Sequence, residues 1–199
     1  MRKTGKTKKK TTRKTRSKVY ILKSVYSIGS ETMPNWVKNI VHAIEPDADF
    51  NKFTDEKGNF DFNKIIPMPD NIYRGDLGEE ERRKYGENNW YDWSYKNWGT
   101  KWNACETRTY EHTVEFNTAW SCPLPLLVEL GKKVGGILVF YADEDIGSNL
   151  GGFIVRANGS IRELDNEEIL GTIIHYGVDV YDNDVVEEFR WEIEEEDDE

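Results

Sequence analysis

Thiol and imidazole side chains are the first place to look for catalytic chemistry, and this 199-residue sequence holds two cysteines and three histidines. Cys122 and His112 are the pair that could act as nucleophile and base, because a reactive thiolate needs a nearby proton acceptor. An acyl-transfer site also needs an orienting group and an oxyanion hole, and the sequence signals neither of them. We therefore expect Cys122 to be a structural thiol, and we predict that the protein is not an enzyme.

Carboxylates beside a histidine are the second candidate chemistry, because such clusters bind metal ions. Glu111, His112 and Glu115 lie on one predicted strand, where alternation points His112 away from both acids. The acidic run at 143–145 precedes Gly147 but lacks the spacing of a calcium loop, so we interpret it as an acidic turn. We predict no metal site and no cofactor. Three acids are kept as candidate partner-binding residues: Asp143, Glu144 and Asp145.

Phosphate binding is the chemistry that residues 1–18 favour, because they contain ten Lys or Arg and no acid. Beyond Met1 this segment has no apolar residue, so burial cannot offset its ordering entropy and we predict a disordered arm. It would contact nucleic-acid phosphates without sequence preference. A solvated tail, or one that folds back on the acidic remainder, are the alternatives. The candidate nucleic-acid-binding residues are Lys8, Lys9, Lys10, Arg13, Lys14 and Arg16.

The remainder of the chain is strongly acidic. Outside the arm there are 17 basic and 37 acidic residues, which makes a balance of −20 against −10 for the whole chain. This charge repels phosphate and suits a basic protein partner. Residues 187–199 carry nine of the acids, and we predict an acidic tail there. With no apolar run of 18 residues and only two cysteines, we predict a cytoplasmic protein with no membrane contact.

Residues 88–106 hold four of the seven tryptophans, which raises the question of a stacking surface for bases or sugars. A base-stacking platform needs a basic groove, but the two lysines here are offset by acids. The spacing instead predicts a helix from about 90 to 97, capped by Asn88 or Asn89, with an aromatic stripe turned toward a sheet. The stripe consists of Tyr91, Tyr95, Trp98 and Trp102. Off this stripe lie Trp90 and Trp93, which we predict to be the more exposed, partner-binding tryptophans.

Other periodic segments must position these residues. Strands are expected at 19–28, 35–45, 107–120 with a bulge near Asn117, 136–145, on both sides of Asn158-Gly159, and at an edge over 186–194. Helices are expected at 76–86, at 122–135 and after Asp165 as N-cap, and residues 46–78 form a long ordered loop. This order predicts one α+β domain over 19–186, an antiparallel sheet with helices packed on one face and an additional N-terminal strand.

Four motifs in order also suggest a family. They are MPNW at 33–36, FDFNKIIPMP at 60–69, NWYDWSYKNWGTKWNA at 89–104 and EFNTAWSCPLPLLVEL at 115–130. Together they resemble the YubB-like proteins of phages and plasmids. The resemblance implies a ferredoxin-like core at about 89–176, with two helices on one face of the sheet, and a mobile-element origin. It implies no reaction.

The chain departs from that family at two places. Family members begin near the MPNW segment, so residues 1–32 resemble an extension with a function of its own. The position of Cys122 is commonly a small residue or proline in the family, which again argues against a catalytic thiol.

Three functional hypotheses remain open. The first is a non-enzymatic accessory protein that modulates a host by binding a host protein through its acidic surface. The second is a nucleic-acid-binding protein that uses its basic arm, and the third is a hydrolase or nuclease.

Overall fold

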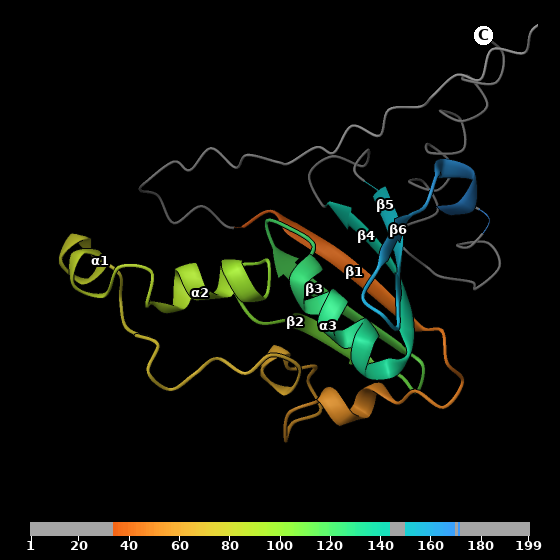
Figure 1. Cartoon of the computed structure of the whole chain (residues 1–199), viewed down its shortest axis with the longest axis horizontal. Coiled ribbons are helices and arrows are strands. Elements are labelled where there is room, and N and C mark those ends of the chain that lie inside the picture. Colours follow the sequence, from red (N-terminus) through yellow and green to blue (C-terminus); the bar gives the residue numbers. More distant parts are fainter. Residues whose placement is uncertain (1–33, 144–149, 170, 172–199) are drawn as a thin grey trace, which may run out of the picture. The chain divides into compact units, whose positions relative to one another are not determined.

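The computed structural model describes residues 34–143, 150–169 and 171. The predicted arm, the strand at 19–28, the edge strand at 186–194 and the acidic tail lie outside the described residues, as do Glu144 and Asp145. The strands are β1 Trp36–Ala43, β2 Cys105–Thr109, β3 Thr113–Ala119, β4 Gly136–Asp143, β5 Leu150–Arg156 and β6 Ile161–Glu163 (Figure 1). The helices are α1 Glu79–Tyr85, α2 Trp90–Asn97 and α3 Leu124–Val134, with 3-10 turns η1 Phe50–Phe53 and η2 Phe62–Lys64.

The six strands form one antiparallel sheet in the order β2-β3-β1-β4-β5-β6. β1 therefore lies inside the sheet, where it pairs with β3 on one side and β4 on the other. This arrangement confirms the predicted α+β class and the antiparallel pairing. Among the described helices, none is long and apolar enough to cross a membrane.

One face of the sheet carries the main core. Directly opposed residues of neighbouring strands share a face, which brings Val41, Val114 and Val139 together. α3 packs against β4 and β5, and its Leu126, Leu127 and Leu130 are fully buried. The helix ends at Gly135, whose φ of 83° is the left-handed conformation that glycine adopts without strain.

The predicted loop at 46–78 supplies core residues, which its composition did not indicate. Phe50, Phe60 and Phe62 are 0–1% exposed, and the rings of Phe60 and Phe62 contact Phe116 of β3 at centroid distances of 5.2 and 5.6 Å. The main chain of this segment bonds to β2 and the residues before it, since Phe60 N donates to Thr107 Oγ1 and Phe62 N donates to Asn103 Oδ1. The loop therefore covers the part of the core face that α3 does not reach.

The prediction of one strand over 107–120 was wrong, because this segment contains two strands. β2 and β3 are joined by a tight turn in which Tyr110 N donates to Thr113 O at 2.7 Å. The irregularity lies in β2, between Cys105 and Arg108, and Cys105 is paired with Asn117, so the predicted bulge occurs on the strand opposite Asn117. Glu106, with φ of 49°, lies at this point and accepts a hydrogen bond from the Asn117 side chain. Residues 110–113 contain no glycine or proline, so the sequence did not indicate a turn between the two strands.

The second face of the sheet is also apolar in its middle, where Ile40, Phe140 and Ala142 are at most 5% exposed. Leu164 and Ile169, which follow β6, approach this face at Gly152. A Cβ on Gly152 would lie 3.1 Å from Leu164 and 3.3 Å from Ile169, so the glycine allows the chain to fold back there.

Candidate binding surface

The start of α2 is held by one buried residue, Asn89. Its Oδ1 accepts hydrogen bonds from Tyr91 N and Asp92 N, both at 3.0 Å, which is the arrangement of a helix N-cap. Its Nδ2 donates to Asp92 Oδ2 and to Gly86 O, both at 2.6 Å. Because Asn89 binds both the main chain and the carboxylate of Asp92, it holds that carboxylate in place.

The end of α2 is anchored in the core by Trp98. This side chain is 4% exposed, and its indole Nε1 donates to Ile66 O at 2.9 Å. Its ring packs edge-on against Phe62 and Trp93 at centroid distances of 5.7 and 5.2 Å. The helix is therefore pinned at both ends, and its remaining side is open to solvent.

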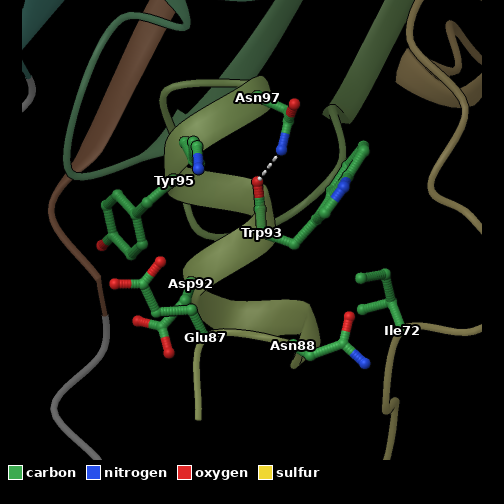
Figure 2. A pocket seen from close by; sticks show the side chains of 8 residues that line it. Ile72, Glu87, Asn88, Asp92, Trp93, Tyr95 and Asn97 are labelled. Atoms are coloured by element: carbon green, nitrogen blue, oxygen red, sulfur yellow. Dashed lines mark hydrogen bonds between the residues drawn. The ribbon is translucent and has the colours of Figure 1, made fainter. Parts of the chain in front are cut away.

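An open groove of about 730 Å³ runs along this solvent side. Figure 2 shows Glu87, Asp92 and Tyr95 along one side of α2, with Asn88, Trp93 and Ile72 along the other. We name this surface the α2 groove. Its lining residues are Ile72, Glu87, Asn88, Asp92, Trp93, Tyr95, Lys96 and Asn97.

The α2 groove combines aromatic rings, amides and charges of both signs. Asn97 Nδ2 donates to Trp93 O at 2.8 Å and Asn88 Nδ2 donates to Asn71 O at 3.1 Å, so the main chain orients both amides. The lining contains two carboxylates, of Glu87 and Asp92, and one ammonium, of Lys96, which gives the groove one net negative charge. Such a surface offers stacking, hydrogen bonds and charge to a ligand, and its lining includes no Cys, Ser, Thr or His.

The predicted partner-binding residues do not form one site. Trp93 lines the α2 groove, whereas Trp90 is half-buried and its indole donates to Gly75 O at 3.0 Å. Asp143 ends β4, on a different element, so the structure does not bring it to the groove. Sequence reasoning did not identify Glu87 and Asp92 as groove residues. The position of Asp92, three residues after the predicted N-cap Asn89, was the signal that could have indicated an oriented carboxylate.

The predicted aromatic stripe is only partly correct. Trp98 is buried as expected, but Trp102 is 36% exposed, and Tyr91 and Tyr95 lie half-buried against each other at 4.9 Å. Within α2 itself the buried residue is Ser94, whose hydroxyl donates to Trp90 O. Because α2 docks through its two ends, its tyrosines do not reach the sheet core.

A second surface feature gathers at the sheet end where β1 begins and β3 ends. Trp102 lies 6.3 Å from Trp36 and under the ammonium of Lys101, 4.2 Å from its ring centroid. Trp120 is 44% exposed and has a φ of 73°, a strained conformation for a bulky residue. Leu124, at 41% exposure, follows it. We name Trp36, Trp102, Trp120 and Leu124 the tryptophan end.

Hydrogen bonds between two loops assemble the tryptophan end. Thr100 Oγ1 donates to Ala119 O at 2.8 Å, and Ser121 Oγ donates to Gly99 O at 2.7 Å. Gly99, with φ of 85°, lies so close to Pro125 that a Cβ would come within 2.5 Å of the proline ring. The loop before β2, which carries Trp102, and the loop before α3, which carries Trp120, are therefore held together by these hydrogen bonds.

The thiol and imidazole candidates are not brought together. His112 precedes β3, and its Nδ1 lies 3.0 Å from Ala48 O, whereas Cys122 follows the other end of the same strand. A seven-residue strand spans about 20 Å, which is too far for proton transfer. Burial raises the pKa of the Cys122 thiol, which disfavours the reactive thiolate. Within the described ranges no cluster of three His, Cys, Asp or Glu could hold a metal ion.

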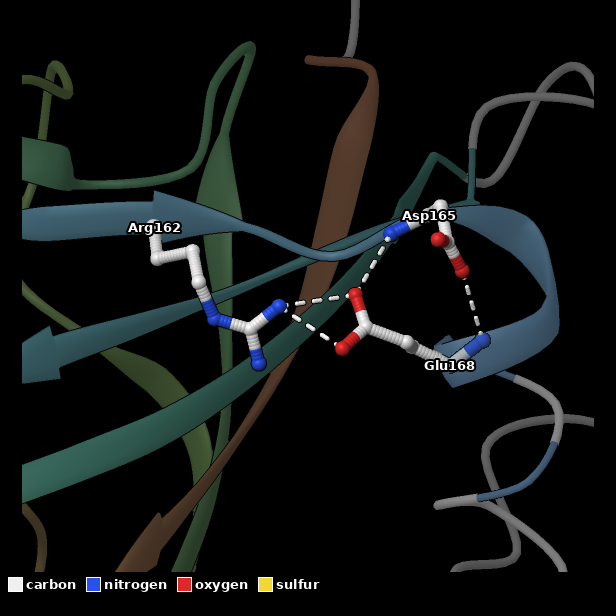
Figure 3. A network of polar contacts seen from close by, with 3 residues as sticks. All are labelled: Arg162, Asp165 and Glu168. Atoms are coloured by element: carbon white, nitrogen blue, oxygen red, sulfur yellow. Dashed lines mark hydrogen bonds and ion pairs between the residues drawn. The ribbon is translucent and has the colours of Figure 1, made fainter.

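A polar cluster after β6 is structural. Figure 3 shows one guanidinium nitrogen of Arg162, Nη1, which donates to both carboxylate oxygens of Glu168 at 2.7 and 2.8 Å. Asp165 accepts from Glu168 N and its own N donates to the Glu168 carboxylate, which is a capping box. The prediction that Asp165 caps a helix is thereby confirmed. These side chains bind one another and the main chain, so the cluster stabilises the fold.

One part of the chain matches a known family model. The family model described as the ferredoxin-like domain in Api92-like protein matches residues 97–173. Comparisons with curated proteins and with solved structures gave no match. The match and the antiparallel sheet agree with the predicted fold class, a ferredoxin-like α+β domain.

Proposed function

We propose that this protein is a non-enzymatic accessory protein that acts by binding a protein partner. The observation that carries the proposal is the tryptophan end, where Trp102 and Trp120 are 36% and 44% exposed although each could bury a large apolar area. Tryptophan is enriched among the residues that dominate binding energy at protein interfaces. The strained φ of Trp120 supports the proposal, since such strain concentrates at functional positions.

The origin and location of the partner are parts of the same proposal. The YubB-like resemblance supports a phage or plasmid protein, and hence a protein of the host cytoplasm as the partner. The balance of −20 in residues 19–199 favours a partner with a basic surface, because opposite charge accelerates encounter and excludes acidic competitors.

A pair of matched double variants tests the proposal. Purified chain is used to capture proteins from host lysate, and the captured partner is then purified and its affinity is measured. Trp102→Ala with Trp120→Ala should weaken binding at least tenfold, since interface tryptophans typically cost about 2 kcal/mol or more on truncation. The control is Ile44→Ala with Tyr110→Ala, which removes side chains of 50% and 53% exposure at the opposite end of the sheet. Equal effects of the two pairs, or no stoichiometric partner, contradict the proposal.

Nucleic-acid binding through residues 1–18 is a second candidate, which the ten Lys and Arg of that segment favour. Deleting residues 1–18 should abolish binding to duplex DNA, and binding by the full chain should fall steeply as salt rises. An absence of binding by the full chain at low salt excludes this candidate.

A further inference from the structure

We propose that the α2 groove binds an arginine side chain presented by a basic segment of a protein partner. The proposal rests on the protein-binding function only in that the ligand belongs to a polypeptide. It concerns a different surface from the tryptophan end and is tested by a separate experiment.

The carboxylates are the first argument. Asp92 is half-buried and is oriented by the 2.6 Å hydrogen bond from Asn89. Its side chain therefore loses little conformational entropy when a ligand binds. Asn89 bonds only Oδ2 of the Asp92 carboxylate, and the carboxylate of Glu87 lies beside that of Asp92 in Figure 2. Two adjacent carboxylates match the planar fork of a guanidinium better than the point charge of an ammonium.

The aromatic rings are the second argument. Trp93 and Tyr95 line the groove on either side of α2, and a guanidinium stacks favourably on such ring faces. The chain already uses this contact next to the groove, where the Arg82 guanidinium lies 5.4 Å from the Tyr91 ring centroid. Tyr95 lies on the same side of α2 as the two carboxylates, and these three groups together favour a flat cation over an anion or an aliphatic group.

Long-range charge is the third argument. Residues 19–199 carry a balance of −20, which attracts a basic segment and repels nucleic-acid phosphate. Lys96 opposes the proposed ligand, because it places an ammonium at the groove. Removing this ammonium should strengthen the binding of a cation. A Lys96 variant is therefore an informative test, because the proposal predicts a gain of affinity.

A neutral sugar is the main competing ligand, since rings and amides also suit carbohydrate. Sugar binding would not depend on the charge of Glu87 or Lys96, nor on salt. An arginine peptide and its citrulline counterpart separate the two cases, because citrulline keeps the planar shape of the side chain and loses the charge.

The experiment titrates the full chain with the peptide acetyl-Gly-Arg-Gly-Arg-Gly-amide and follows the Trp93 indole N–H by NMR. We expect the Trp93 signal to move, Glu87→Gln to weaken binding about two- to fivefold, and Lys96→Gln to strengthen it by a similar factor. The citrulline peptide should bind at least fivefold more weakly than the arginine peptide. Binding should also weaken as salt is raised.

Matched control variants carry the same charge changes on exposed residues between η1 and η2. Glu56→Gln and Lys57→Gln should leave the affinity unchanged. Equal binding of the citrulline peptide, equal effects of Glu56→Gln and Glu87→Gln, or an unmoved Trp93 signal would each overturn the proposal. A neutral oligosaccharide that moves the Trp93 signal when the arginine peptide does not would assign the groove to carbohydrate. None of these measurements involves the tryptophan end. The groove proposal can therefore fail while the proposed function holds, and the reverse is also possible.

Discussion

Asn39 is a polar residue in the middle of the sheet, with no exposed surface. Its Nδ2 donates to Thr118 Oγ1 at 2.8 Å and to Val37 O at 2.9 Å, while no residue that the structure describes bonds its Oδ1. Thr118, also fully buried, bonds onward to Ser121 O. The pair therefore ties β1 to β3 and to the tryptophan end by side-chain hydrogen bonds.

Thr118→Val should lower the free energy of unfolding by about 1–3 kcal/mol, because it leaves the Asn39 amide without its side-chain acceptor. The double variant Asn39→Leu with Thr118→Val should cost less than the sum of the two single variants, since neither polar group is then stranded. Urea unfolding measures all three values. Strict additivity would show that the hydrogen bond carries no coupling energy.

Glu168 gives the region after β6 a dependence on pH. Hydrogen bonds from Arg162 and from the main chain of Asp165 lower the pKa of its carboxyl below the ordinary 4.5. A lowered pKa in the folded state means that the stabilising contribution is present above pH 4.5 and is lost as pH falls through the folded pKa. The protection factors of the amide hydrogens in residues 161–169, which are corrected for the intrinsic slowing of exchange at low pH, should therefore fall below about pH 4. Glu168→Gln should show fast exchange at neutral pH too, and persistence of the pH response in that variant would exclude Glu168 as its cause.

α3 contains a glycine, a residue of low helix propensity, in its interior. Gly131 lies inside this helix, where glycine costs about 1 kcal/mol relative to alanine. The structure supplies the reason, because a Cβ at this position would lie 2.7 Å from Val155 Cγ1 and 3.4 Å from Ile137 Cγ1. The helix packs so closely on β4 and β5 that a side chain does not fit.

Gly131→Ala should therefore destabilise the protein by a net of roughly 1–2 kcal/mol, since overpacking outweighs the gain in helix propensity. Val155→Ala should reduce the penalty of Gly131→Ala when the two are combined, because it removes the clashing methyl groups. Thermal unfolding of the three variants tests this. A stabilised Gly131→Ala variant would mean that helix and sheet separate easily.

The core joins segments that are far apart in the sequence. Phe62 belongs to the long loop, yet its ring lies 5.6 Å from Phe116 of β3 and 5.7 Å from Trp98 after α2. Sheet, α2 and loop thus share one apolar cluster. The structure as a whole should therefore unfold as one cooperative unit, with the loop included.

Phe62→Ala should cost about 3–5 kcal/mol, the range for a fully buried aromatic ring. Since the loop is part of the common core, the urea midpoint should fall while the slope of the transition stays constant. A new early transition that involves only residues 46–78 would show that the loop is a separate cover.

Local chemistry in the sequence predicted much of the secondary structure. Strand β1, helices α1, α2 and α3, the hairpin at Asn158-Gly159 and the caps Asn89 and Asp165 each depend on residues close in the chain, and the structure confirms them. Their signals are periodicity, turn residues and capping side chains. The same signals failed at 107–120, where the turn between β2 and β3 has no glycine or proline.

Burial and neighbourhood depend on contacts between distant segments, and only the tertiary structure decided them. From the sequence Trp98 and Trp102 share one helical stripe, but the first is 4% and the second 36% exposed because the chain leaves α2 between them. Likewise Glu87 and Asp92 line the α2 groove together with Ile72, which is distant from them in the sequence. The sequence by itself determined the charge and most of the elements, since these depend on residue counts and on residues close in the chain. The tertiary structure decided which aromatic and charged side chains remain exposed.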